Sequence, residues 1–376
     1  MSQNRRDFIK RGTSLAAISS VGVNMNSASN CFTPSAEIVK DAGMQMCLAY
    51  FWGIEPHKVA LARQMDVLGA VGGINPRMVG MDNVPNWEYD VIKKVQQAWK
   101  NEGLTLRVIE GPPSLYTKTK LGLEGRDEEI ANFITFMENI SRLGIDTVCY
   151  NWMPVISWAR TTLDKPSRGG ALVSSFRTEG IEDEPLITEY GELTKDKMWT
   201  NMEYFLKAVV PEAEKYGVKL ALHPDDPPID NIRGIPRIMT SVAAFKRLIE
   251  IVPSASNGLT FCQGSFASMG AEGEGENIPA AIEYFGKRSK IHFVHFRDVR
   301  GHKDNFEETF HDDGKTDMYR AMQAYYDVGF RGPIRPDHVP TMAGDSNERP
   351  GYSTIGALFA IGYIRGLMEG VTKNST

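Results

Sequence analysis

The chain is poor in cysteine and has no long apolar run, and each shortage excludes a class of protein. Four cysteines among 376 residues are too few for a disulfide scaffold of this size. No stretch approaches the roughly 18 to 20 apolar residues that a membrane-spanning helix needs, so we expect no membrane span. An excess of basic charge is also missing, because 42 Lys and Arg stand against 47 Asp and Glu. The net charge of −5 argues against a nucleic-acid partner.

The composition that remains is that of a folded globular protein. Apolar residues make up 42% of the chain and charged residues 24%, which excludes a disordered chain, a collagen-like repeat and a coiled coil. The length fits two or three domains of average size, or one α/β barrel, because such barrels exceed the average domain.

The first residues are predicted to be a targeting signal and not part of the folded domain. Arg5 and Arg6 precede a weakly apolar stretch over residues 13–23, and small polar residues follow over residues 24–30. This order resembles a twin-arginine export signal. We therefore separate residues 1–35, as export signal and tail, from a catalytic domain over residues 36–376. The protein is predicted to be periplasmic or otherwise exported, and cytoplasmic if the signal interpretation is wrong.

Short apolar, β-prone runs alternate with segments of helical spacing through the rest of the chain. We expect strands at residues 46–52, 71–75, 105–110, 147–151, 219–224, 259–264, 291–298 and 333–338. Several are apolar almost throughout, which suits a parallel sheet covered by helices. Eight such units predict an α/β fold of the (β/α)8 TIM-barrel type. A doubly wound open sheet is the competing fold, and no glycine-rich dinucleotide fingerprint follows an early strand to support it.

Glycine follows nearly every predicted helix, at positions 69, 103, 144, 217, 286 and 329. Because glycine adopts positive φ without a Cβ clash, we expect these residues to end the helices. The spacing breaks once, between the fourth and fifth strands. Residues 161–197 are polar and charged there, ahead of a helix that begins near Met198. We expect an insertion at the barrel mouth, either a lid or a passive surface excursion.

Side chains that can bind a metal lie at the ends of the last four predicted strands. In a TIM barrel the active site lies where the strands end at their carboxyl side. Here these ends carry His223, Cys262, His295 and Asp337. Two imidazoles, a thiolate and a carboxylate suit a divalent transition metal, and the thiolate argues against Mg²⁺ and Ca²⁺. The residues by themselves leave Fe²⁺, Mn²⁺, Zn²⁺ and Co²⁺ open.

Proton-transfer groups lie close to these ligands in the sequence. His338 follows Asp337 directly, and an imidazole beside a metal can move protons near neutral pH. Tyr352, in the loop before the last helix, is the second candidate.

Basic and amide groups at the same strand ends predict an acidic, hydroxyl-rich substrate, because a guanidinium binds a carboxylate through two hydrogen bonds. The candidate substrate-binding residues are Asn151, Arg160, Arg237, Arg297 and His311. The acidic pairs Glu307–Glu308 and Asp312–Asp313 are interpreted as solvated faces.

Several stretches together resemble the mannonate dehydratase family. They are TVCYNWMPVISWART (147–161), LALHPDDPP (220–228), GIPRI (234–238), NGLTFCQGS (257–265), HFVHFRD (292–298), HDDGKTDMY (311–319), IRPDH (334–338) and PGYSTIG (350–356). The resemblance implies a TIM barrel that dehydrates D-mannonate to 2-dehydro-3-deoxy-D-gluconate in hexuronate breakdown. It also implies that His223, Cys262, His295 and Asp337 hold the metal, and that His338 and Tyr352 transfer protons.

The chain departs from the family pattern after the second strand. The family has paired histidines near the mouth there, whereas this chain reads Gly73-Ile74-Asn75-Pro76-Arg77-Met78. The excursion after the fourth strand is also shorter than in the longer members, and both regions would touch the substrate. Two other functions stay open: a metal-dependent sugar isomerase or epimerase on the same barrel, and an exported sugar-acid binding protein without turnover. The partner is a small sugar acid, and a homo-oligomer is compatible with the sequence.

Overall fold

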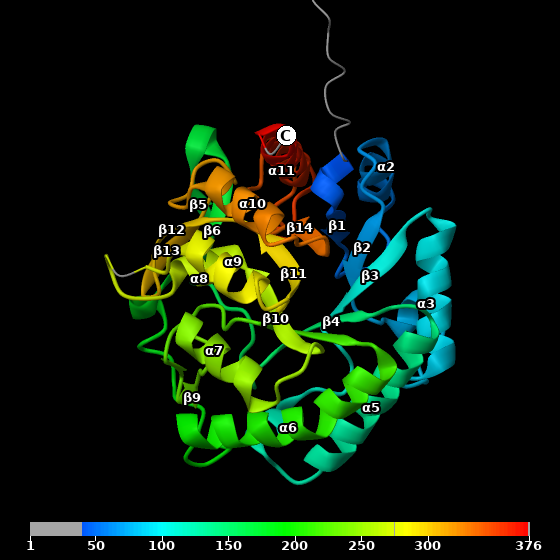
Figure 1. Cartoon of the computed structure of the whole chain (residues 1–376). Helices are drawn as coiled ribbons and strands as arrows, with labels where there is room; N and C mark the ends of the chain where they lie inside the picture. Colours follow the sequence, from blue (N-terminus) through cyan, green and yellow to red (C-terminus); the bar gives the residue numbers. More distant parts are fainter. Residues whose placement is uncertain (1–39, 274, 375–376) are drawn as a thin grey trace, which may run out of the picture. The chain divides into compact units, whose positions relative to one another are not determined.

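The structure, a computed structural model, describes residues 40–273 and 275–374. The predicted export signal and tail, residues 1–35, lies outside the described residues. Eight parallel strands of the described chain close into a barrel, in the order β1-β14-β11-β10-β7-β4-β3-β2 (Figure 1). The predicted TIM barrel is therefore confirmed, and the doubly wound open sheet is excluded because the first and last barrel strands pair with each other.

The barrel strands occupy the eight runs that the sequence predicts. They are β1 (Gln45–Ala49), β2 (Gly69–Gly72), β3 (Thr105–Glu110), β4 (Thr147–Asn151), β7 (Lys219–His223), β10 (Asn257–Cys262), β11 (Ile291–Phe296) and β14 (Pro333–Pro336). Four of the eight strands end one or two residues before the predicted boundary, β1 and β2 end three residues before it, and β3 and β4 end at it.

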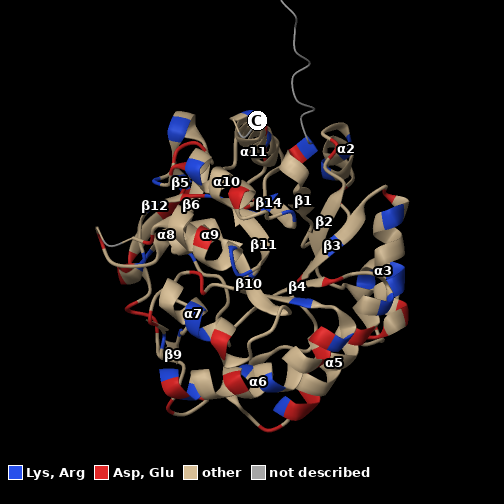
Figure 2. Ribbon diagram, viewed as in Figure 1, with Lys and Arg blue, Asp and Glu red and all other residues tan. Residues whose placement is uncertain are grey.

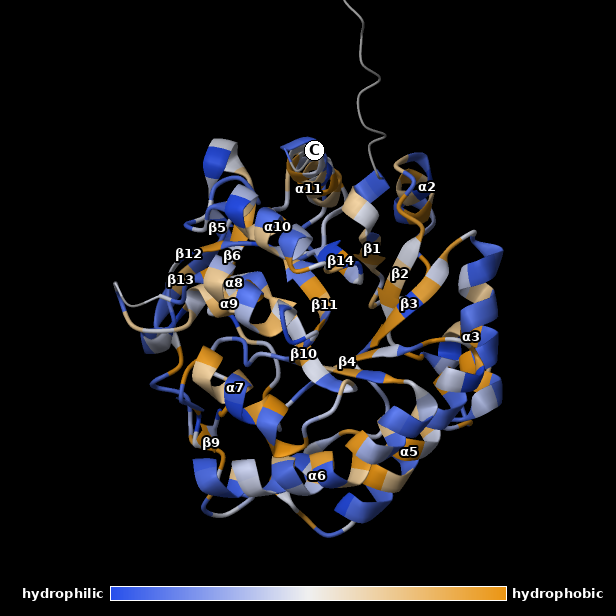
Figure 3. Ribbon diagram, viewed as in Figure 1, coloured by the Kyte–Doolittle hydropathy of each residue, from blue (hydrophilic) through white to orange (hydrophobic). Residues whose placement is uncertain are grey.

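Helices pack outside the barrel (Figure 1). They are α2 (Pro56–Gln64), α3 (Tyr89–Asn101), α4 (Thr117–Leu121), α5 (Arg126–Arg142), α6 (Lys195–Tyr216), α7 (Val242–Ile251), α8 (Gln263–Ser268), α9 (Ile278–Gly286), α10 (Met318–Asp327) and α11 (Thr354–Asn374). Short 3₁₀ helices are η1 (Lys40–Gly43), η2 (Pro76–Val79), η3 (Arg168–Gly170) and η4 (Thr178–Gly180). Charged residues are frequent on outer helices such as α3, α5 and α6 (Figure 2), whereas the residues of the barrel strands are largely apolar (Figure 3).

Local chemistry explains where α6, the helix predicted to begin near Met198, begins and ends. α6 begins at Lys195, three residues before the expected Met198, because the Thr194 side chain accepts a hydrogen bond from the Lys197 amide. It ends at Gly217, whose φ of 66° is costly for residues with a Cβ. Gly69 does not cap a helix as predicted. It is the first residue of β2, where a Cβ would meet the Cys47 sulfur at 2.4 Å.

The barrel interior is built from alternate residues of each strand, since successive side chains point to opposite faces. One layer of inward residues forms a small cluster of its own: Cys47, Val71, Val108, Cys149, Ala221 and Phe293. Two residues further along, the same face presents Glu110, Asn151, His223 and His295. Because every second residue of a strand points inward, polar side chains from four strands lie at one level at the barrel mouth.

A second sheet lies outside the barrel and is made from two excursions. Its strands are β5 (Thr162–Pro166) and β6 (Leu172–Arg177), which follow β4, and β12 (Val299–His302) and β13 (Asn305–Glu308), which follow β11. They pair antiparallel in the order β12-β13-β6-β5, and we call them the auxiliary sheet. A further pair, β8 (Asn231–Ile232) and β9 (Ile235–Pro236), follows β7. Part of the predicted 161–197 insertion therefore forms β-strands. These strands pair with β12 and β13, an excursion after β11 that was not predicted from the sequence.

One described helix, α11, is long and apolar enough to cross a membrane by length and composition. It contacts α10, η1 and β14, which is the position of a helix that covers the barrel.

Candidate active site

A small cavity opens where the barrel strands end. It has a volume of about 150 Å³, and it is lined by Glu110, Gly111, Cys149, Tyr150, Asn151, Met153, Ser157, Trp158, His223, Asp226, His295, Arg335, Asp337, His338 and Tyr352. A larger cavity of about 560 Å³ lies at the amino ends of the strands and contains none of the predicted site residues. We place the site in the smaller cavity because the polar and titratable groups converge there.

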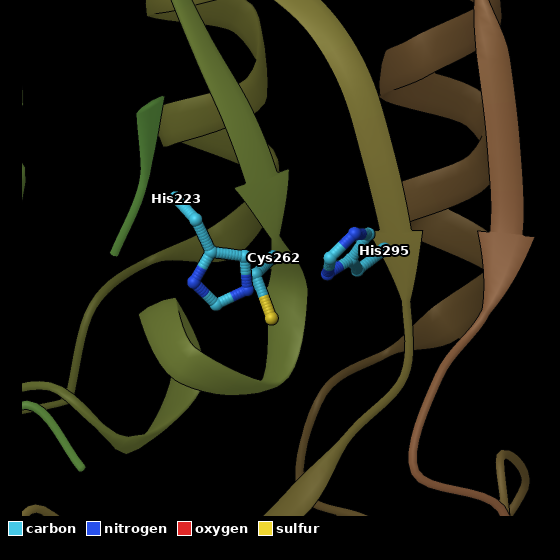
Figure 4. A group of neighbouring side chains, drawn as sticks. All are labelled: His223, Cys262 and His295. Atoms are coloured by element: carbon cyan, nitrogen blue, oxygen red, sulfur yellow. The ribbon is translucent and has the colours of Figure 1, made fainter. Parts of the chain in front are cut away.

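Three of the four predicted metal ligands face one another at this level. The side chains of His223, Cys262 and His295 point together from the ends of β7, β10 and β11 (Figure 4), and their ligand atoms lie within 4.8 Å of each other. The His223 Nδ1 is 2.7 Å from the Pro224 carbonyl, which leaves Nε2 for a ligand. The His295 Nε2 is buried and makes no hydrogen bond among the described residues, although the Glu110 Oε2 lies 3.5 Å from it. A buried imidazole nitrogen of this kind fits a metal ligand.

Asp337 adjoins this group and is also held by two arginines. Its Oδ2 lies 3.8 Å from the Cys262 sulfur and 3.6 Å from the His295 Nδ1. Arg335 donates to its Oδ1 at 2.6 Å, and Arg297 donates to its Oδ2 at 2.9 Å. Burial opposes ionisation, but Arg335 and the neighbouring cations outweigh it and hold the pKa of Asp337 well below its ordinary value. Asp337 is therefore a carboxylate, and the donor set fits a divalent transition metal.

Two other groups of side chains could in principle hold a metal, and their surroundings argue against both. Cys149 joins Glu110 and His295 in one of them. The Cys149 sulfur belongs to the apolar layer inside the barrel and accepts a hydrogen bond from Thr260 at 3.1 Å. The other group is Asp226, Glu308 and His338. Its carboxylates already bind arginines, as described below.

His338 reaches the cavity through an unusual backbone conformation. Its φ of 42° lies in the left-handed region, which is strained for a residue with a side chain and is frequent at functional sites. This turn lets both Asp337 and His338 line the cavity, although neighbours in an extended strand point to opposite sides. The His338 ring packs against Trp158 and Tyr352, at centroid distances of 5.5 and 5.6 Å.

Tyr352 lies on the same wall as His338. Its hydroxyl is 3.5 Å from the Asp337 Oδ1, and its ring packs edge-on against Phe51 and Trp52. Burial, together with the Asp337 charge, raises the pKa of Tyr352 well above its ordinary value. Without a ligand, the phenol therefore keeps its proton.

The predicted substrate-binding residues divide into two sets. Asn151 lines the cavity, whereas Arg160, Arg237, Arg297 and His311 are outside its lining. Arg237 is fully buried, binds Asp225 at 3.3 Å and donates to the Ile156 carbonyl at 2.6 Å, so it secures the loop after β4. His311 is also fully buried.

Arg160 and Arg297 belong to a buried charge network beside the cavity. Arg297 donates to Asp226 and Glu308, at 2.8 Å in each case, besides its bond to Asp337. Arg160 binds the same two carboxylates, Asp226 and Glu308, from the other side. Glu308 does not belong to a solvated face as predicted, because it is only 2% exposed. That expectation was wrong, since β13 turns Glu308 inward and leaves Glu307 at the surface.

Asn151 is oriented by a lysine that sequence reasoning missed. Lys120 donates to the Asn151 Oδ1 at 2.9 Å, and the Met153 amide donates to the same oxygen at 3.0 Å. Both bonds occupy the amide oxygen and leave the Nδ2 donors for a ligand. Burial lowers the pKa of Lys120 to about 7.

Other missed residues are Glu110, Asp226, Glu308 and Arg335. Glu110 ends β3, and Arg335 donates to its two oxygens at 3.1 and 3.2 Å. The strand period could have identified Glu110, because it stands two residues beyond the inward Val108. No local pattern marks Glu308, whose strand belongs to the auxiliary sheet.

Comparison with known proteins assigns the family. D-mannonate dehydratase (UxuA) is the family that matches, over residues 44–186 and 184–376. The chain belongs to the D-mannonate dehydratase family. It is 34% identical over 362 residues to the mannonate dehydratase of Thermotoga maritima, covering 87% of this chain and 98% of that protein. It is 32% identical to mannonate dehydratase 2 of Halalkalibacterium halodurans, covering 88% and 100%. The family resemblance seen in the sequence is confirmed.

Solved structures agree with this assignment. The crystal structure of the mannonate dehydratase from Streptococcus suis superposes with a TM-score of 0.78 at 31% identity, covering 88% of this chain and 94% of that one. A D-tagatose 3-epimerase-like protein superposes with a TM-score of 0.53 at 15% identity, covering 89% and 100%, and shares the fold.

Proposed function

We propose that this protein removes water from D-mannonate and forms 2-dehydro-3-deoxy-D-gluconate. Family membership and the relatives named mannonate dehydratase support this reaction. The observation that carries it within this chain is one cavity of about 150 Å³ in which His223, His295, His338 and Tyr352 meet. A small sugar acid would be the partner, and its dehydration would belong to hexuronate breakdown.

The residues that would hold the metal are His223, Cys262, His295 and Asp337. The family assignment and the convergence of three of these ligand atoms within 4.8 Å support a metal centre here. A bound divalent ion supplies electrostatic stabilisation for the negative charge that develops beside the substrate carboxylate when C2 loses its proton. Fe²⁺ and Mn²⁺ are our first candidates, followed by Co²⁺ and Zn²⁺, since all accept imidazole and thiolate ligands.

His338 and Tyr352 divide the proton transfers in this proposal. One takes the proton from C2, and the other gives a proton to the hydroxyl that leaves C3, so the C3–O bond breaks and water departs. The enol that remains rearranges to the 2-keto acid. Arg335 and Arg297 keep Asp337 ionised throughout. The Asn151 amide donates to a substrate oxygen, while the Trp158 ring limits the access of water to His338.

Purified protein supplied separately with Fe²⁺, Mn²⁺ or Co²⁺ tests the reaction on a panel of hexonates. We expect the 3-deoxy-2-keto acid, measured with thiobarbiturate, to form from D-mannonate. His338→Asn should lower kcat by about 10³-fold or more while metal content stays at the wild-type level. Wild-type turnover in this variant would contradict the role of His338.

The same assay, extended to neutral aldoses and ketoses, separates the two remaining functions. A sugar epimerase or isomerase would change the configuration of a neutral aldose or ketose without forming a keto acid. A binding protein would retain an aldonate in equilibrium dialysis and convert none of it. Either result in metal-loaded protein would overturn the dehydratase proposal.

The location of the protein is a separate part of the proposal. The Arg5-Arg6 pair and the apolar stretch after it support export by the twin-arginine route. Cell fractionation of the wild-type chain and an Arg5→Lys, Arg6→Lys variant tests it. A wild-type chain found only in the cytoplasm would refute export.

A further inference from the structure

Glu308 touches the proposed proton-transfer histidine from outside the barrel. It ends β13 of the auxiliary sheet, and its Oε1 lies 2.9 Å from the His338 Nδ1. Both side chains are buried, with Glu308 2% and His338 5% exposed. The two residues are 30 positions apart in the sequence. Glu308 comes from the auxiliary sheet, and not from a barrel strand or a helix that covers the barrel.

The carboxylate is fixed in place by two arginines. Arg297 donates to Oε2 at 2.8 Å, and Arg160 donates to Oε1. Arg160 is itself held by Asp226, and its guanidinium lies over the Phe306 ring at 4.7 Å. Burial opposes ionisation of Glu308, but the charges of Arg297 and Arg160, together with the hydrogen bond from His338, outweigh it and lower its pKa below the ordinary value. Glu308 therefore meets His338 as a rigid, ionised acceptor.

We infer that Glu308 is a positioning residue that sets the tautomer and ring orientation of His338. This inference rests on the proposed function, in which His338 transfers a proton. A carboxylate accepts hydrogen bonds only, so the proton of the neutral imidazole must sit on Nδ1. The lone pair then belongs to Nε2, which lies 3.8 Å from the nearest Asp337 oxygen and has no hydrogen-bond partner among the described residues.

This arrangement gives His338 a defined direction of proton transfer. In this tautomer Nε2 can accept a proton and cannot donate one. When the proton from C2 arrives, the C–H bond breaks, a new N–H bond forms at Nε2, and the electron pair stays on the substrate. The ring becomes an imidazolium, and the Glu308 charge stabilises it through the same Nδ1–H bond. The auxiliary sheet thus acts on the chemistry through Glu308, without contact with substrate.

Glu307 offers a matched control on the same strand. It carries the same charge one residue earlier, points to the opposite side, and pairs with Lys165 and Arg300 at the surface. Its side chain is 23% exposed. Glu307→Gln therefore removes an equal charge from β13 without touching His338.

Nitrogen NMR of the histidine rings tests the tautomer directly. The probe is full-length protein labelled with ¹⁵N-histidine and loaded with diamagnetic Zn²⁺, and His338→Asn identifies the His338 signals. We expect a protonated Nδ1 and an unprotonated Nε2 in the wild type and in Glu307→Gln. Glu308→Gln should move the proton to Nε2 or leave a mixture, because the glutamine amide can donate to Nδ1.

Kinetics supply the second readout. Glu308→Gln should lower kcat for D-mannonate by about 10²-fold, change KM by less than about threefold and retain the metal, as losses of orienting partners do. Glu308→Asp, which keeps the acceptor charge, should recover part of the loss. Glu307→Gln should match the wild type.

Several results would overturn the inference. A proton on the wild-type Nε2, alone or together with Nδ1, contradicts the assigned tautomer, and this holds even if Glu308→Gln does not fold. Unchanged kcat in a folded Glu308→Gln contradicts the positioning role. The NMR measurement needs no substrate, so it judges the inference separately from the dehydratase proposal. If wild-type protein converts no D-mannonate, the proposed function fails while the tautomer is still measured.

Discussion

At the scale of single residues, the position of a histidine along its strand decides what it can do. β11 carries His292 and His295, three residues apart. His295 stands at the carboxyl end and reaches His223 at a ring-centroid distance of 4.9 Å. His292 stands near the amino end, where the β10–β11 register shifts, and its Nδ1 donates to the Leu220 carbonyl at 3.0 Å. One imidazole therefore serves the cavity, while the other is a structural residue.

His292 should make the protein less stable in acid. Burial lowers its pKa from 6.5 to about 4, so between these values the unfolded chain binds more protons than the folded one. Its contribution to stability is complete above pH 6.5 and is lost as the pH falls toward 4. The loss approaches about 3 kcal/mol over this interval.

Urea unfolding of wild type and His292→Gln between pH 4 and 7 measures this effect. The difference in unfolding free energy between the two should shrink as the pH falls, because the variant has no group to protonate. The exposed His57, changed to Gln, is the control and should leave the wild-type profile intact. A difference that is constant with pH would refute the argument.

At the scale of elements, two excursions far apart in the sequence complete each other. β6 pairs with β13, and Phe176 faces Phe306 across that pair at a centroid distance of 5.7 Å. Neither excursion would be a sheet alone, since an isolated hairpin is marginally stable. Together they hold Glu308 and the arginines beside the barrel mouth.

The β12–β13 hairpin depends on Gly301. Its φ is 101°, and a Cβ there would meet the Asn305 carbonyl oxygen at 2.1 Å. Gly301→Ala should therefore distort the hairpin, displace Glu308 and lower kcat at least about tenfold, with a loss of more than about 1 kcal/mol in stability. Metal content should not change. Gly362→Ala is the control, because Gly362 lies in α11 with nothing within 4 Å of an added Cβ. Wild-type activity in Gly301→Ala would show that the hairpin does not position Glu308.

At the scale of the whole molecule, the candidate ligands join the last four strands of the barrel. β7, β10, β11 and β14 lie side by side in the closed sheet, and each supplies a ligand at its end. An ion bound there would stabilise the folded barrel, because the unfolded chain cannot assemble the four groups.

Removal of the metal should lower the melting temperature of the protein. Binding at about a thousand times the Kd contributes about 4 kcal/mol, so EDTA should reduce Tm by several degrees. Cys262→Ala should abolish this response, whereas Cys149→Ala should retain it, because Cys149 accepts a hydrogen bond from Thr260 at 3.1 Å within the apolar barrel layer. Differential scanning fluorimetry and metal analysis measure both effects. An EDTA response in Cys262→Ala equal to that of the wild type would exclude Cys262 as a ligand.

The sequence by itself determined the barrel fold and placed the candidate site at the carboxyl ends of the barrel strands. Apolar runs of strand length alternate with helical stripes, and the polar residue that ends each run marks the mouth, so His223, Cys262, His295 and Asp337 could be named in advance. These signals are local, because a few consecutive residues determine both the alternation of side chains along a strand and the residue at which the strand ends.

Tertiary structure alone decided how charge is distributed around that level. Arg160 and Arg297 read as substrate ligands in the sequence, but they bind Asp226 and Glu308 in the fold. Glu308 read as a surface residue because its own neighbours are polar, and only the pairing of β13 with a strand 130 residues earlier buries it against His338. Ion pairs between distant segments produce no repeating pattern in the sequence of either segment, so they cannot be predicted from it. The side chains that orient the proposed proton-transfer group therefore became visible only once the two excursions were brought together.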